Sequence, residues 1–151
     1  MNRLEVYTDG SGTTAVNPGG WAFLIVDVEA QLVVAAGTGS TVDTTNNQME
    51  LMAAIEGLKA AHKLRDALYP GAEVILKTDS MYVIGVGSGK CRAWANWEFV
   101  QALRGMIVYF GTRFAFEHVK GHSGNQFNEA VDRVARHMRK MVLSEQEAPH
   151  E

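Results

Sequence analysis

The chain has 151 residues, 46% hydrophobic and 21% charged, a composition typical of one compact globular domain. Its net charge of −3 argues against a uniformly basic nucleic-acid-binding surface, although a local basic patch is compatible with that charge. A single cysteine, Cys91, excludes an internal disulfide framework, and the absence of an apolar signal or membrane-spanning run predicts a cytoplasmic protein with no membrane attachment.

The first half of the chain predicts strands followed by a helix. Polar and apolar residues alternate in the first segment, and the next two segments form a hairpin that turns near Glu29–Gln31. Helical spacing then begins, with Thr45, Asn46 or Asn47 available as its N-cap, and it is broken at Pro70. The predicted elements are strands over 3–8, 20–29 and 31–40, a helix over 44–64 and a strand over 72–78.

The second half predicts crossover connections and a final amphipathic helix. The predicted elements are a short helix starting at 80, a helix over 96–110, a fifth strand over 112–119, a polar loop over 120–128 and a helix over 129–142. We therefore expect a single domain over 1–142. The acidic segment 143–151 is expected to be a disordered tail.

This order of elements predicts an α/β fold. Three strands joined by short turns pair antiparallel, whereas strand–helix–strand links favour parallel pairing with right-handed crossovers. The expected architecture is a five-stranded mixed sheet with helices on both faces. Binding sites in such sheets lie at the carboxyl ends of the parallel strands.

Two strands end in the same local sequence, Thr-Asp followed by Gly or Ser, at Asp9 and Asp79. If these strands are parallel neighbours, the carboxylates lie about 5 Å apart and repel unless a cation separates them. Oxygen ligands of this kind suit Mg²⁺. The alternative is that each aspartate only forms a turn after its strand.

Further candidates lie on two of the predicted helices and in a loop. Glu50 lies beside a helix face of small residues that can pack closely on the sheet, but Glu50 could also form a capping box with Asn47. Asp132 could join the same site or form a surface ion pair with Arg136. His122, in a glycine-flanked loop, is either solvated or a proton-transfer group.

Four ordered segments resemble a known family. They are YTDGSG, TTNNQMELMAAIEGL, KTDSMYV and FEHVKGHSGNQFNEAVDRVAR, with compatible gaps between them. Together they closely resemble the type 1 ribonuclease H family over nearly the whole chain, to about Arg139. The resemblance implies the RNase H fold, which has the sheet derived above.

The resemblance implies a reaction and its residues. The reaction is endonucleolytic hydrolysis of the RNA strand of RNA–DNA hybrids by two-metal-ion catalysis, leaving 5′-phosphate and 3′-hydroxyl ends. Asp9, Glu50, Asp79 and Asp132 would bind two Mg²⁺ ions, which Mn²⁺ should be able to replace, and His122 would assist proton transfer or product release. We expect a monomer with no obligate protein partner.

The resemblance also implies substrate contacts. RNA is distinguished by its 2′-hydroxyl in a wide minor groove. Residues at matching positions are Gly10, Ser11, Gly12, Asn17, Asn46 and Gln48 toward the RNA strand, Thr45, Asn47 and Asn96 toward the DNA strand, and Met81 and Trp94 beside the groove. Helix capping by Thr45 or Asn46 and a turn at Asn17 are the ordinary alternatives. Trp94 and Trp97 could provide sugar-stacking surfaces or pack in the core or at the rim, and packing is the expectation for Trp97.

The chain departs from many bacterial and animal members in one segment. Where they carry a basic, Trp-rich protrusion, residues 85–95 are short and hold only Lys90 and Arg92 as cations. The chain thus looks like a bacterial or phage member without the protrusion. Because fewer phosphate contacts weaken binding and its salt dependence, we expect weaker hybrid binding than in protrusion-bearing relatives.

Other functions fit the sequence less well. A Holliday-junction resolvase or transposase core shares the fold but fits TNNQMEL and VKGHSG poorly. A non-catalytic hybrid-binding module would not need four carboxylates. A sugar-kinase-like phosphate loop at DGSGTT would need two such domains, for which the chain is too short.

Overall fold

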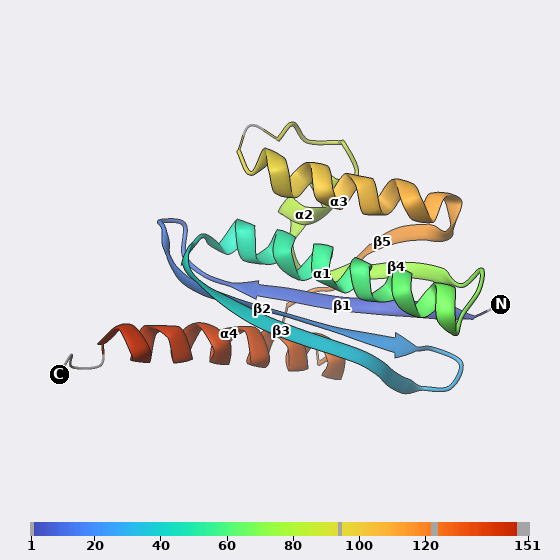
Figure 1. The fold of residues 1–151 in the computed structure, drawn as a ribbon, viewed down its shortest axis with the longest axis horizontal. Coiled ribbons are helices and arrows are strands. Elements are labelled where there is room, and N and C mark those ends of the chain that lie inside the picture. Colours follow the sequence, from blue (N-terminus) through green and yellow to red (C-terminus); the bar gives the residue numbers. More distant parts are fainter. Residues whose placement is uncertain (1, 94, 122–123, 148–151) are drawn as a thin grey trace.

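The computed structural model describes residues 2–93, 95–121 and 124–147, and Figure 1 shows their arrangement. The strands are β1 Arg3–Ser11, β2 Asn17–Asp27, β3 Leu32–Thr44, β4 Glu73–Thr78 and β5 Phe114–His118. The helices are α1 Asn46–Ala67, α2 Met81–Gly87, α3 Trp97–Phe110 and α4 Gln126–Glu147, with a 3₁₀ turn, η1, at Gly111–Arg113. The order of these elements is the predicted one.

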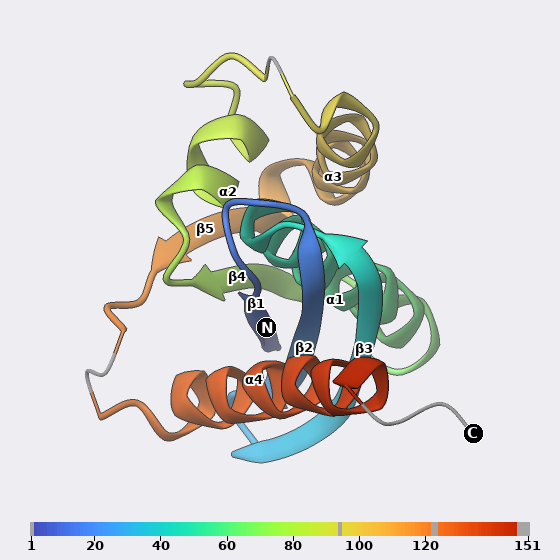
Figure 2. The same cartoon turned by 90° about the vertical axis from the view of Figure 1, so that its left-hand side faces the viewer.

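The five strands form one mixed sheet in the order β3-β2-β1-β4-β5. β1 pairs antiparallel with β2 and parallel with β4, and β5 is parallel to β4. Helices α1 and α3 lie on one side of the sheet and α4 lies on the other (Figures 1 and 2). This confirms the predicted α/β architecture.

Side-chain alternation along β1 assigns its residues to two layers. Leu4 and Val6 are fully buried in the core under α1, whereas Tyr7 packs in a second cluster with Val131 and Ala135 of α4. Because side chains of a strand alternate between faces, Asp9 lies on the α4 side and Gly10 on the α1 side. Asp9 and Gly10 therefore face different helices, α4 and α1 respectively.

Small residues let α1 approach the sheet, as the sequence predicted. Ala53, Ala54, Gly57 and Ala61 are buried along the inner face of this helix. A Cβ added at Gly57 would lie 2.8 Å from the Val6 side chain, so the helix could not pack as closely with a larger residue there.

Several element boundaries differ from the predictions, and the two largest differences are at the ends of β3 and α4. β3 continues to Thr44, not Ser40, because its antiparallel pairing with β2 extends to Asn17. The last helix was wrongly predicted to end at Val142 before a disordered tail from 143, since α4 runs to Glu147. No Gly or Pro interrupts 143–147, so helical hydrogen bonding continues there. Residues 148–151 lie outside the described residues.

The helices within 2–93, 95–121 and 124–147 include none long and apolar enough to cross a membrane. The longest, α1 and α4, are both 22 residues and carry charged side chains along their exposed faces.

Candidate active site

Parallel pairing brings the two strand-end aspartates together. In the β1–β4 register Tyr7 lies opposite Lys77, so Asp9 and Asp79, each two residues further on, leave neighbouring strands at the same level. Asp9 is only 4% exposed, and Asp79 is half-buried one residue beyond the end of β4. Their side chains therefore share one edge of the sheet, as the repeated Thr-Asp pattern predicted.

Glu50 reaches the same place from α1 because the helix contacts β1 at a glycine. A Cβ on Gly10 would overlap the backbone nitrogen of Glu50 and the carbonyl carbon of Met49, so only glycine permits this contact. The Gly10 N–H donates a hydrogen bond to Glu50 Oε1 and another to Asp9 Oδ1 at 3.0 Å. Glu50 is thus oriented toward the aspartates, and its predicted alternative, a capping box with Asn47, is not formed.

The three carboxylates form a tight, buried cluster. One oxygen each of Asp9, Glu50 and Asp79 lies within 4.8 Å of the others. Burial raises the pKa of Asp9 to about 10, with repulsion from Glu50 and Asp79 adding to it. Burial also raises the pKa of Glu50 to about 7 and, together with repulsion from Asp132, raises that of Asp79. Such a cluster is unfavourable alone and fits a hard divalent cation.

Asp132 lies beside this cluster, and its carboxylate also forms an ion pair with Arg136. It lines the same cavity of about 510 Å³ as Asp9, Glu50 and Asp79. Arg136, one turn further along α4, binds it in a fork, with Nε donating to Oδ1 at 3.2 Å and Nη2 to Oδ2. Both sequence readings of Asp132 therefore hold, since it borders the site and also forms the i,i+4 ion pair.

Thr45 and Asn96, two residues predicted to face the DNA strand, are linked through Gln48, which is predicted to face the RNA strand. Gln48 Nε2 donates to Asn96 Oδ1 at 3.1 Å, and Asn96 Nδ2 donates to the Tyr82 hydroxyl at 3.1 Å. Thr45 caps α1 by accepting a hydrogen bond from Gln48 N at 3.3 Å. The start of α3 is therefore held against the start of α1, which brings Thr45 and Asn96 to one region.

The remaining predicted contacts differ in how firmly they are held. Asn46 Oδ1 accepts a hydrogen bond from Gly12 N at 3.2 Å, whereas Asn17 is exposed and donates to Thr13 Oγ1 at 3.3 Å. Asn47 is also exposed. Ser11, on the α4 side of β1, and Met81, 63% exposed, line the cavity beside the carboxylates. Trp97 is 48% exposed and packs against Arg104, which confirms its place at the rim.

Two predicted residues, His122 and Trp94, lie outside the described residues. The roles assigned to them therefore stay predictions.

The sequence did not single out three residues that line the site. Ser80 is buried and caps α2 through Val83 N. Burial raises the pKa of Glu50, and a hydrogen bond to the Ser80 side chain partly opposes that rise. Tyr82 and Arg136 line the carboxylate cavity. The signal for Arg136 was its i,i+4 spacing from Asp132, which indicated only a surface pair.

Comparisons with known proteins agree on one family. A family model described as RNase H matches residues 1–140. The Ribonuclease H of Pseudomonas entomophila is 37% identical over 149 residues, covering 89% of this chain and 91% of the relative. The Ribonuclease H of Syntrophomonas wolfei is 35% identical over 150 residues, covering 90% of this chain and 95% of the relative.

Solved structures show the same fold at lower identity. The N-terminal RNase H domain of a Mycobacterium tuberculosis protein is 20% identical, with a TM-score of 0.82 over 97% of this chain and 99% of that domain. LC11-RNase H1, solved in complex with an RNA/DNA hybrid, is 20% identical, with a TM-score of 0.78 over 93% of this chain and 99% of that protein.

Proposed function

Because this chain belongs to the ribonuclease H family of metal-dependent endonucleases, we propose that it cleaves the RNA strand of RNA–DNA hybrids by two-metal-ion catalysis. The observation that carries the proposal is the convergence of Asp9, Glu50 and Asp79, from three separate elements, within 4.8 Å. Their raised pKa values fit a site meant for divalent cations, which would offset the carboxylate repulsion.

The carboxylates would hold the metal ions that supply the chemistry of the reaction. Two Mg²⁺ ions held there would activate the attacking water and stabilise charge on the scissile phosphate and the leaving 3′-oxygen. Asp9, which interacts with Glu50, Asp79 and Asp132, would be the least replaceable of the residues that hold the ions. Gly10 N–H and Ser80 hold Glu50 in place, so its orientation needs no rearrangement. Asp132 would complete the site from α4, and the products would carry 5′-phosphate and 3′-hydroxyl ends.

Recognition of the hybrid would use the two sides of the α1 N-terminus. Toward the RNA strand lie Asn46 and Gln48 and the backbone of Gly10–Gly12, which can meet 2′-hydroxyls. Toward the DNA strand, Thr45 and Asn96 would bind a phosphate, aided by the positive end of α1. The bonds of Gln48 to Asn96 and of Asn96 to Tyr82 support this division because they fix the spacing between the two contacts.

Several broader expectations belong to the same proposal. We propose one catalytic domain that includes the whole of α4 to Glu147, acting as a monomer on the hybrid alone, in the cytoplasm. His122 would assist proton transfer or product release. Mn²⁺ should replace Mg²⁺, since both accept carboxylate oxygens in similar geometry.

Cleavage of a labelled hybrid tests the proposal. With Mg²⁺ or Mn²⁺ the protein should cut the RNA strand of an RNA–DNA hybrid and leave double-stranded RNA and double-stranded DNA intact. Excess chelator should abolish cleavage because the carboxylates alone cannot activate water. End-group analysis should find 5′-phosphates. Equal cleavage of double-stranded RNA, or undiminished activity in chelator, would contradict the proposed substrate or mechanism respectively.

A further inference from the structure

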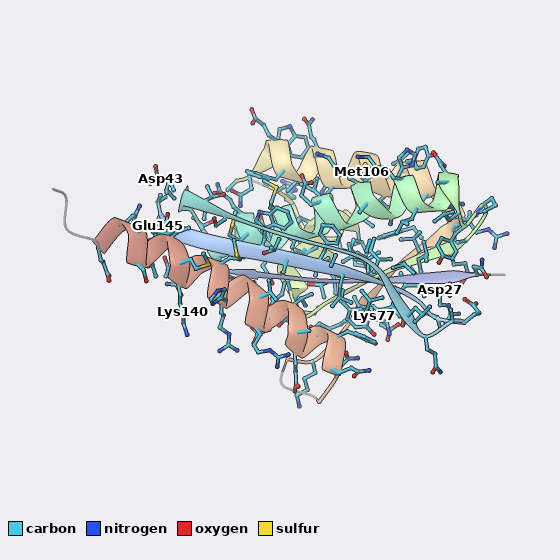
Figure 3. All side chains as sticks on the ribbon, turned by 60° about the horizontal axis from the view of Figure 1, so that its bottom comes forward. Asp27, Asp43, Lys77, Met106, Lys140 and Glu145 are labelled. Atoms are coloured by element: carbon cyan, nitrogen blue, oxygen red, sulfur yellow. The ribbon has the colours of Figure 1, made fainter. Side chains whose placement is uncertain are left out.

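A row of basic side chains follows the outer face of α4. Arg133, Arg136, His137 and Lys140, here called the basic ridge, have the spacing i, i+3, i+4, i+7 and therefore share one side of the helix. All four are exposed, and they line a surface cavity of about 510 Å³ together with Asp132 and Val134. Lys140 lies on the side of α4 that faces away from the sheet (Figure 3).

The basic ridge is continuous with the carboxylate site. Asp132 and Arg136 line both cavities, so the ridge begins where the catalytic cavity ends. From Arg133 to Lys140 the helix rises about 10 Å. At about 3.4 Å of duplex axis per phosphate on one strand, this length corresponds to about three successive phosphates.

The charge of the basic ridge is largely unneutralised. Within the described part of the chain, Arg133 and Lys140 form no ion pair, and the only acid bound to Arg136 is Asp132 of the carboxylate site. This positive row stands out on a chain whose net charge is −3. The ridge therefore provides cations that can bind a polyanion beside an otherwise acidic cavity.

We propose that the basic ridge binds backbone phosphates of the hybrid, on one side of the cleaved bond only. The inference rests on the proposed function. Because the two cavities share Asp132 and Arg136, a strand bound at the carboxylates can continue along the ridge, which makes the substrate itself a better occupant than an acidic protein segment. The ridge would thereby supply phosphate contacts that the short segment 85–95, with Lys90 and Arg92 as its cations, provides only sparsely.

Neutralising the two unpaired cations tests the inference. In R133Q/K140Q the KM for a long hybrid should rise about tenfold at 0.1 M salt with kcat unchanged, because only ground-state phosphate contacts are lost. The slope of log(kcat/KM) against log salt should become shallower by about two, close to one for each contact. R133K/K140R, which keeps both charges, should behave like the wild type.

The matched control removes two charges at the other end of the sheet. Arg3 and Arg113 both pair with half-buried Glu73 near the amino ends of β1 and β4, away from the carboxylates. R3Q/R113Q should therefore keep the wild-type KM and salt slope, and thermal melts should show all variants folded.

Hybrids truncated on one side give the sharper result. With ribonucleotides confined to a short central block, shortening one flank should raise the wild-type KM and leave that of R133Q/K140Q unaffected, whereas shortening the other flank should affect both equally. If the wild type cleaves hybrids but R133Q/K140Q matches R3Q/R113Q in KM, slope and flank dependence, the ridge inference is overturned alone. If the wild type cleaves no hybrid, the proposed function fails first.

Discussion

Asp9→Asn should reduce hybrid cleavage by about 1,000-fold or more while the protein stays folded. Asn has nearly the shape of Asp but lacks the charge needed to hold a divalent cation in the middle of the cluster. Metal stabilisation of the transition state contributes several kcal/mol, and each 1.36 kcal/mol is a factor of ten in rate. Single-turnover cleavage of a labelled hybrid in Mg²⁺ measures the effect. Cleavage at the wild-type rate would exclude the metal mechanism.

The same variant should stabilise the metal-free protein, and the gain should grow with pH. Asp9 has a pKa of about 10 in the folded chain, against 3.8 ordinarily, so above about pH 4 the folded state retains a proton that the unfolded state has lost. The free energy of unfolding of the wild type therefore falls as pH rises toward 10, by up to about 1.4 kcal/mol per pH unit. Asp9→Asn removes this titration.

Urea unfolding in chelator measures the stability effect. The free-energy difference between Asp9→Asn and wild type should be small near pH 4 and up to about 4 kcal/mol larger at pH 8 than at pH 5. Saturating Mg²⁺ should reduce the difference, because the ion binds only the wild-type cluster tightly. A stability difference independent of pH would contradict the electrostatic explanation.

Gly10→Ala should lower the free energy of unfolding by about 3 kcal/mol and reduce cleavage strongly. An added Cβ overlaps the α1 backbone at Met49 and Glu50, and backbone cannot move aside as a side-chain end can. If α1 shifts to relieve the overlap, Glu50 loses its hydrogen bond from Gly10 N and leaves the cluster. Urea unfolding and single-turnover cleavage on the same preparation measure both effects.

Gly105→Ala is the matched control. Gly105 lies in the middle of α3, and an added Cβ there has no heavy atom within 4 Å. Since alanine is a better helix former than glycine, this variant should gain about 0.5–1 kcal/mol of stability and cleave normally. If Gly10→Ala behaved like Gly105→Ala, the close contact between β1 and α1 would not be what positions Glu50.

The prediction of weak hybrid binding was based on the segment 85–95 alone. This short segment holds only two cations, so it offers few contacts to phosphates. The basic residues of α4 alternate with apolar ones over 133–140, so the sequence indicated only an amphipathic helix. Only the fold shows that their outer face continues from the carboxylate cavity.

Sequence alone determined the element order, the sheet class and the candidate carboxylates. Strand and helix periods are local, and Thr-Asp at two parallel strand ends predicts that Asp9 and Asp79 share an edge. The sequence also contains four motif segments in the order typical of the ribonuclease H family. The family match over residues 1–140 agrees with them and disfavours the resolvase and kinase interpretations. These properties can be predicted from the sequence because each depends on residues that are close together in the chain.

The tertiary structure decided which reading of each ambiguous residue applies. Glu50 joins the cluster and forms no capping box, because Gly10 on the α1 side of β1 admits the helix backbone. Asp132 comes to the same cavity because Asp9 points to the other side, toward α4, yet it also keeps Arg136. Sequence could not choose between these readings, since each depends on which sheet face a distant helix covers and how closely it packs.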